Sequence, residues 1–530
     1  MKHYRPSLVL TLALAAMAAG CLFSACKKGE GAKPATKDDT TAVLSPRDED
    51  SLKYLMYQIM QVSFVDGGRN TNNDLPTYYW YNQVPSLDPG SAAYPTADDL
   101  LSRMKSYPRW QGKPVDRYSF LDRTGNISDQ IEHGVVDGLS SGLGSKGDFG
   151  LQISYTQDVQ TGKTHLLVVY ADKNSPAGLK GIQRGWEITA VNGNNDVSYD
   201  GAKGANVTRV ETAIYHSRQV SLTFRKPDNT SVTYNLDAGG YQVNPILFDS
   251  IYTRGDKKIG YFVFYTFSSV DDDHGSTFTR QALDQEFDKL KAAGINDLIV
   301  DLRYNGGGAV TTAEYLDSAI APASTKGKVM YRYQYNDKLT KNESLLGLVP
   351  AVNFPGGGGL QLDHVFFIVS RNTASASELT LNNLKPYMDV KLVGDTTYGK
   401  PVGFIDFTIS DYDAAGKKQY LADLYAINFA TLNADGVGGY FGGIPPDAAA
   451  NDYINIPWGN PFDDNLDKIF NYIATGSFAR SHERMSPQEN PRIGIPESMP
   501  SLRFNGMIDY KLSGRVKAGL KKMHQRSGQP

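Results

Sequence analysis

The chain has 530 residues, a formal net charge of -3 and 40% hydrophobic residues, which excludes disordered, coiled-coil and multi-pass membrane proteins. The near-neutral charge offers no basic face for nucleic acid, and the length predicts about three domains. Both cysteines, Cys21 and Cys26, lie near the N-terminus. The rest of the chain therefore contains no cysteine nucleophile, thiolate metal site or disulfide.

Residues 1–25 have the pattern of a secretory signal peptide, because two basic residues precede an apolar run that extends from residue 8 to residue 25. Cys26 ends that run after small residues and is followed by a polar segment, as in a bacterial lipobox. We therefore expect lipidation at Cys26, a flexible tether over residues 26–45, and export to the bacterial cell envelope, anchored to the outer membrane. An uncleaved membrane anchor is the alternative interpretation.

Residues 46–130 are predicted to form a small helical N-terminal domain. Ser45 is a suitable N-cap, Pro46 suits the first helical position, and Leu52, Met56 and Ile59 recur at helical spacing. The stretch up to about residue 125 is dense in tyrosine and tryptophan. We favour these rings as core side chains over a carbohydrate-binding platform.

Residues 138–238 contain short alternating or β-branched runs separated by glycine and asparagine, which predicts a small β-rich module. Within it, residues 175–193 resemble the short helix, strand and Asn-Gly turn of a PDZ domain. Phe149, Gly150 and Leu151 occupy the position of the loop that holds a peptide's C-terminal carboxylate in such domains, beside a strand edge that a peptide can extend. The resemblance implies that this module binds polypeptides by their free C-termini.

The candidate catalytic residues lie within residues 244–478. The apolar runs 298–302 and 364–369 are typical of buried parallel strands, and each is followed by a loop and a helix. Repeated βα units of this kind place both loops at the same edge of a sheet, where active sites of open α/β sheets lie. The loops supply the glycine triplet 306–308 and Ser375 at a helix start, and Lys400 follows 25 residues later.

These parts suit a serine hydrolase that uses no histidine. A serine becomes nucleophilic when a base takes its proton, and a buried lysine can do so at neutral pH. Backbone N–H groups after Ser375 and in the glycine turn could hold the oxyanion. Taken singly, each part is more often a helix cap, a turn or a surface lysine. Residues 394–400 also match a Walker A loop, but Pro401 and the following strand argue against nucleotide binding.

Three motifs occur in the order seen in the carboxy-terminal processing peptidases, or tail-specific proteases: Asp-Leu-Arg-Tyr-Asn-Gly-Gly-Gly at 301–308, Thr-Ala-Ser-Ala-Ser-Glu at 373–378, and Gly-Asp-Thr-Thr-Tyr-Gly-Lys at 394–400. The resemblance spans most of residues 45–475. It implies a crotonase-like (ClpP/crotonase) α/β core preceded by the PDZ-like and helical domains. Ser375 then takes the role of nucleophile and Lys400 that of base, with Gly307 and Ala376 as oxyanion donors. The N-terminal part looks like that of Bacteroidetes-type lipoprotein members.

One position departs from the family pattern. Many members carry a glutamine four residues after the lysine, where this chain has Phe404. The departure leaves either a bare Ser/Lys dyad or a dyad assisted by Glu378. Val402 and Phe404 are apolar enough to help desolvate the lysine.

The prediction is therefore a tail-specific serine endopeptidase without cofactor, metal or nucleotide, acting on polypeptides. The alternative is an inactive, surface-tethered peptide-binding protein on the same fold. The histidines lie in no triad motif, and residues 271–274, Asp-Asp-Asp-His, are more typical of a solvated acidic loop than of a metal site. Residues 479–530 are interpreted as a C-terminal tail.

Overall fold

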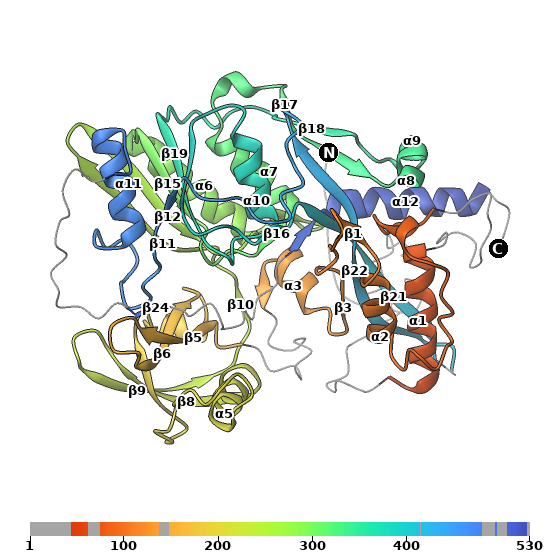
Figure 1. The fold of residues 1–530 in the computed structure, drawn as a ribbon, viewed down its shortest axis with the longest axis horizontal. Coiled ribbons are helices and arrows are strands. Elements are labelled where there is room, and N and C mark those ends of the chain that lie inside the picture. The colour runs from red at the N-terminus through yellow and green to blue at the C-terminus, as the bar shows by residue number, and fades with distance from the viewer. Residues whose placement is uncertain are drawn as a thin grey trace, which may run out of the picture.

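The computed structural model describes residues 44–61, 75–136, 148–413, 415–479, 493–494 and 506–526. The predicted signal peptide, nearly all of the tether and Cys26 lie outside these residues. Within them, helices and strands are mixed along the chain, as the α/β prediction requires (Figure 1). Among the described helices, none is both long enough and apolar enough to cross a membrane.

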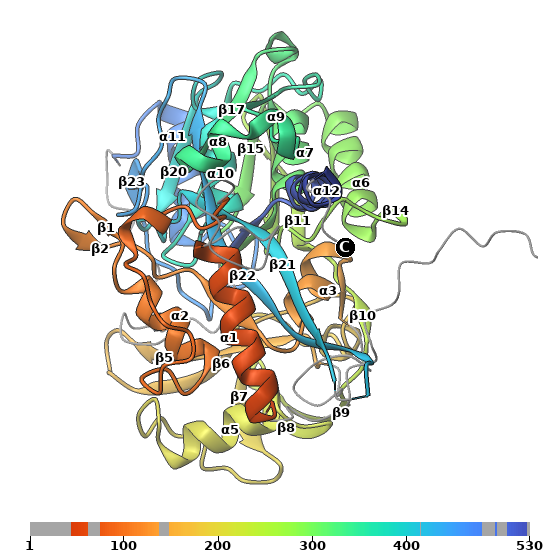
Figure 2. The same ribbon diagram turned by 90° about the vertical axis from the view of Figure 1, so that its right-hand side faces the viewer.

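The N-terminal part packs onto the rest of the chain. Its elements are α1 (Pro46–Gln61), a short 3-10 helix η1 (Tyr81–Gln83), α2 (Ala97–Lys105), β1 (Arg109–Trp110), β2 (Lys113–Pro114), β3 (Phe120–Asp122), α3 (Asn126–Glu132) and β4 (Val135–Val136). Thr96 and Asp99 close a capping box at the start of α2. Tyr78, Trp80 and Tyr118 are buried, as the core interpretation predicts, whereas Trp110 is exposed and departs from it. The three buried side chains belong to the same hydrophobic cluster as many residues of the predicted peptidase region, residues 244–478. Helix α1 lies against strands β21 (Val402–Tyr412) and β22 (Lys418–Asn433) of that region (Figure 2).

The β-rich module has a hydrophobic cluster of its own, which includes Phe149, Trp186 and Phe224. Its sheet has the order β24-β5-β6-β7-β8-β9. The elements are β5 (Leu151–Asp158), β6 (Thr164–Ala171), α4 (Pro176–Leu179), β7 (Glu187–Val191), α5 (Ala205–Tyr215), β8 (Gln219–Arg225), β9 (Ser231–Asp237) and the distant β24 (Ile493–Gly494). β10 (Tyr241–Gln242) leads out of the module and pairs with β4, which precedes it.

The central sheet of the peptidase region has the order β11-β12-β15-β19-β20-β23, and its neighbours from β12 onward run parallel. The strands are β11 (Ile246–Arg254), β12 (Lys257–Phe264), β15 (Asp297–Asp301), β19 (His364–Val369), β20 (Val390–Gly394) and β23 (Ala448–Ala449), with helices α6 (Phe278–Ala293), α7 (Val310–Ile320), α10 (Ala376–Leu384) and α11 (Asp464–Thr475). Alternate residues of β15 belong to different clusters. Leu298 packs with α6 and α7, and Ile299 packs with α11, so both faces of the sheet are covered.

A second sheet lies against α7 and α10, with the order β16-β25-β21-β22-β17-β18 and β3 added to β22. Its strands are β16 (Gly307–Ala309), β17 (Val329–Tyr335), β18 (Ala351–Asn353), β21 (Val402–Tyr412), β22 (Lys418–Asn433) and β25 (Gly506–Ile508). The remaining described elements are the hairpin β13 (Asp271–Asp272) and β14 (Gly275–Ser276), η2 (Ala323–Thr325), α8 (Asp337–Lys341), α9 (Glu343–Leu346) and α12 (Tyr510–Arg526). The predicted tail thus contributes an interior strand, because Met507 and Ile508 are fully buried between β16 and β21.

Candidate active site

Ser375 lies at the N-terminus of α10, directly after the loop that follows β19. Its backbone has φ 63° and ψ −111°, which non-glycine residues rarely adopt. The loop holds this conformation through Ala374, whose N–H donates to Asn305 O at 3.1 Å, and Ser377, whose Oγ donates to the same oxygen at 3.1 Å. Ser375 is fully buried, and its Oγ makes no hydrogen bond within the described residues. No hydrogen bond therefore occupies the hydroxyl, although Ser375 is the N-cap of α10 and forms a capping-box pattern with Glu378.

Glu378, in the first turn of α10, joins the serine loop to the lysine loop. Its Oε2 accepts the backbone N–H groups of Ser375 and Lys400, each at 2.8 Å. Its Oε1 accepts Gly399 N at 2.7 Å and Thr397 Oγ1 at 2.5 Å. Burial raises the pKa of Glu378, whereas these hydrogen bonds favour the ionised form. Because all four partners are donors, the group acts as a carboxylate that fixes the two loops together.

Lys400 is fully buried, and its Nζ lies 3.7 Å from the ring centroid of Phe404 and 5.4 Å from that of Tyr118. Burial lowers the pKa of Lys400 well below its ordinary value, although the charges of Asp116 and Glu378 oppose that shift. The environment therefore favours a neutral amine, which is the form that can accept a proton.

The N-terminal part supplies contacts to the lysine loop that sequence patterns did not reveal. Tyr118 Oη donates to Gly399 O at 2.5 Å, and Arg117 donates to Tyr398 O at 2.6 Å. Asp116 Oδ1 accepts the N–H of Tyr118 at 3.0 Å and thereby shapes this segment. Only the family resemblance of the N-terminal part could have indicated these contacts. Local sequence patterns could not, because the paired residues lie nearly 300 positions apart.

The two predicted oxyanion donors are brought together. Gly307 has φ 100°, and a Cβ there would lie 2.9 Å from Ala376 N and 2.3 Å from Gly506 O, so only glycine allows this approach. The Gly307 N–H, however, donates to Asn305 Oδ1 at 2.9 Å. An oxyanion at this position would have to compete with that side chain.

The predicted peptide-binding residues Phe149, Gly150 and Leu151 differ in their surroundings. Phe149 is 1% exposed and packs into the core of the β-rich module. The N–H of Gly150 donates to the side chain of Asp148, so an internal carboxylate occupies a donor that a peptide terminus would use. Gly150 and Leu151 line a cavity of about 240 Å³.

That cavity reaches the peptidase region, because Gly306 and Gly307 are also among its lining residues. Tyrosine side chains from both regions form much of its wall: Tyr170, Tyr215, Tyr241, Tyr265 and Tyr304. The space therefore runs from the predicted peptide-binding segment to the predicted oxyanion turn.

A buried ionic network holds the module against the core. Arg184, from the module, donates to Asp452 Oδ1 at 2.6 Å and to Tyr304 Oη at 3.0 Å. Arg303, in the motif after β15, bonds the same Asp452 oxygen at 2.8 Å and also Asp301 and Asp463. Burial alone would raise the pKa of Asp452, but the two guanidinium groups hold it below its ordinary value. Asp452 is therefore the ionic link between the two regions.

Comparisons with known proteins identify the class. Residues 258–447 match peptidase family S41. The carboxy-terminal processing protease CtpA of Bacillus subtilis is 25% identical over 323 residues, 60% of this chain and 60% of that protein. The carboxyl-terminal-processing protease of Synechocystis sp. is 24% identical over 391 residues, 71% of this chain and 77% of that protein. The match of residues 258–447 to this peptidase family confirms the resemblance that the motifs predicted.

A solved structure has a similar fold. The putative S41 protease from Bacteroides fragilis superimposes with a TM-score of 0.55 at 20% identity, covering 76% of this chain and 95% of that one. The likeness confirms the mixed α/β fold.

Proposed function

We propose that this protein is a serine endopeptidase in which Ser375 is the nucleophile and Lys400 the general base, on a crotonase-like core. The observation that carries the proposal is the Glu378 clamp. It ties the backbones of both residues to one carboxylate oxygen. The serine hydroxyl has no hydrogen-bond partner among the described residues, and this includes Lys400 Nζ. Burial supplies the second requirement, a lysine that is neutral enough to act as a base.

The chemistry follows from these two groups. Lys400 Nζ takes the proton of Ser375 Oγ as that oxygen bonds the scissile carbonyl carbon, and the carbonyl electron pair moves to its oxygen. Collapse breaks the C–N bond, and the lysine returns the proton to the leaving amine. Water then attacks the acyl-enzyme with the same base and restores the serine hydroxyl. The N–H of Ala376 would stabilise the oxyanion in both steps, joined by that of Gly307 when Asn305 yields it.

The proposal includes a PDZ-like role for the β-rich module in selecting polypeptides by their C-termini. Its support is the cavity of about 240 Å³ that touches both Leu151 and Gly307. A chain held along residues 151–156, the part of β5 that does not pair with β24, would reach the oxyanion turn through this space. Because Asp148 already engages the N–H of Gly150, a peptide terminus would have to displace that carboxylate. We also propose that Cys26 is lipidated and anchors the protein in the bacterial envelope.

An inactive peptide-binding protein is the second candidate. Phe404 in place of the usual glutamine and the engaged N–H of Gly307 favour it. The two candidates differ in whether an acyl-enzyme forms.

The test is covalent labelling of the intact protein with a fluorophosphonate, read by intact mass. The wild type and a control variant of the module, Ser221→Ala, should each gain one adduct. Ser375→Ala should gain none, and it should not cleave an unfolded protein substrate. A wild-type protein without an adduct would favour the binding-protein candidate. An adduct on Ser375→Ala would place the nucleophile elsewhere.

A further inference from the structure

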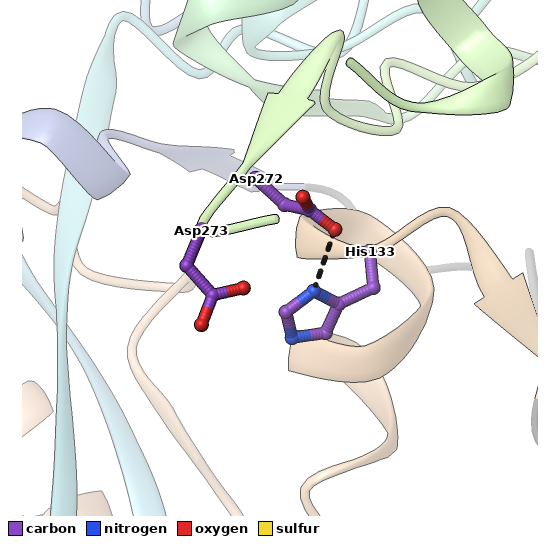
Figure 3. Close-up of side chains that lie close together, drawn as sticks. All are labelled: His133, Asp272 and Asp273. Atoms are coloured by element: carbon purple, nitrogen blue, oxygen red, sulfur yellow. Dashed lines mark hydrogen bonds and ion pairs between the residues drawn. The ribbon is translucent and has the colours of Figure 1, made fainter. Parts of the chain in front are cut away.

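A cluster of histidine and aspartate side chains lies away from the candidate active site, where the C-terminal end of α3 meets the hairpin β13–β14. His133, Asp272 and Asp273 each offer one ligand atom, and these atoms all lie within 4.8 Å of one another. Figure 3 shows the imidazole of His133 below the carboxylate of Asp272 and beside that of Asp273. A hydrogen bond of 3.2 Å joins Nδ1 of His133 to Oδ2 of Asp272. Residues 139 positions apart in sequence thus bring together the donor types that bind transition metals.

His274 adds a fourth donor at the same hairpin. Its Nε2 lies 3.3 Å from Asp273 Oδ1, and its ring centroid is 6.5 Å from that of His133. The side chain of His274 is 84% exposed and that of Asp273 69%, so both can rotate toward an ion. Two imidazoles and two carboxylates form a donor set that suits a tetrahedral ion with bonds of about 2.0–2.2 Å.

The hairpin is held in shape by groups outside the donor set. Asp272 Oδ1 accepts the N–H of His274 at 2.8 Å, which leaves Oδ2 directed at His133. Asp271 is bound by Arg280 through both carboxylate oxygens, at 3.1 and 2.6 Å, and is thereby kept out of the set. Preorganisation of this kind orients metal ligands before the ion arrives.

The electrostatic surroundings also favour a cation. His133 lines a cavity of about 310 Å³ whose wall carries Asp129, Glu132, Asp406 and Asp423 against one lysine, Lys517. Asp406 is 7% exposed, and its Oδ1 makes no hydrogen bond within the part of the chain that the structure describes. The acidic side chains of this wall outnumber its one lysine, which pairs with Asp406, so the surroundings of His133 favour a cation.

We propose that His133, Asp272, Asp273 and His274 form a structural site for a divalent transition metal of the zinc class. Binding would replace the hydrogen bond between His133 and Asp272 by a bond from each of these groups to the ion. The site would fasten the segment that leads into the β-rich module, because β4 follows His133 directly and pairs with β10. It would thus add a metal cross-link at the junction of the module and the peptidase region.

The test uses the untagged full chain, stripped with a chelator and titrated with Zn²⁺ alone by calorimetry. One ion should bind per chain. His133→Gln and Asp272→Asn should each weaken binding at least about tenfold, since even outer-shell changes cost that much. The matched control is His216→Gln, an exposed histidine at the end of α5, which should bind as the wild type does. Circular dichroism establishes that each variant is folded.

Two further readouts sharpen the result. Co²⁺ in the site should give the visible absorption of a tetrahedral ion, and Zn²⁺ should raise the melting temperature of the wild type but not of His133→Gln. The absence of stoichiometric Zn²⁺ binding would overturn the proposal. Undiminished binding by the folded His133→Gln and Asp272→Asn proteins would overturn it equally, and the pair would then be a simple hydrogen bond on a solvated loop.

Discussion

Two buried basic side chains, Arg303 and Lys400, have opposite surroundings. Arg303 bonds three carboxylates, Asp301, Asp452 and Asp463, and these charges raise its pKa well above the ordinary value despite burial. Lys400 has a phenylalanine ring 3.7 Å from its nitrogen, and burial lowers its pKa well below the ordinary value. Burial among carboxylates keeps a charge and builds structure, whereas burial among rings removes a charge and creates a base.

The largest effect is expected for Lys400→Arg. Arginine keeps a positive charge and cannot lose its proton, so the peptidase rate should fall by about three to four orders of magnitude, as for loss of a catalytic-triad member. The control is Lys391→Arg, whose partner Asp389 lies on the surface. Initial rates on an unfolded protein substrate measure the effect, and a Lys400→Arg protein of undiminished activity would rule out the dyad.

Some of the surroundings of Arg303 and Lys400 could be predicted from the sequence, and others could not. The family motifs predicted Ser375 and Lys400 as the catalytic pair, and the apolar character of Phe404 predicted a desolvated lysine. The bond from Glu378 to the lysine loop was not foreseen, because Ser-x-x-Glu at a helix start has the same pattern as a capping box. Asp452 lies in no recognisable motif, and its network joins residues up to 268 positions apart. Strand β25 is three residues long, too short for a periodic signal.

Arg303→Met tests the structural half of the comparison. It leaves Asp301 and Asp463 buried without their cation, which should lower the free energy of unfolding by about 3–5 kcal/mol. The matched control is Arg371→Met, because Arg371 pairs with Asp395 at the surface, where a salt bridge contributes about 0–1 kcal/mol. Denaturant melts measure both variants. Similar losses in the two proteins would mean that burial does not distinguish these pairs.

Glu378→Gln should lower the maximal rate by about a hundredfold. The amide nitrogen is a donor and would face N–H or O–H donors of the two loops, so these hydrogen bonds would be lost and the loops would be positioned less firmly. The same change removes a negative charge that raises the pKa of Lys400. The rise of activity with pH should therefore shift to lower pH even as the maximum falls. A lower maximum with an unmoved pH profile would assign Glu378 a purely structural role.

Phe404→Gln should have the smallest effect and is the sharpest test of how the lysine is made neutral. The protonated lysine is inactive, so the wild-type rate should rise with pH along one limb set by a pKa below the ordinary lysine value. A glutamine in place of the ring would hydrogen-bond the ammonium and stabilise its charged form, which raises the pKa and moves the limb to higher pH. Above that limb the variant should work within about tenfold of the wild type, since an oriented amine offsets the lost desolvation. Phe429→Leu, which alters another buried ring on the paired strand, serves as the packing control. If the Phe404→Gln limb moves to lower pH, or coincides with that of the wild type, the ring does not set the charge of Lys400.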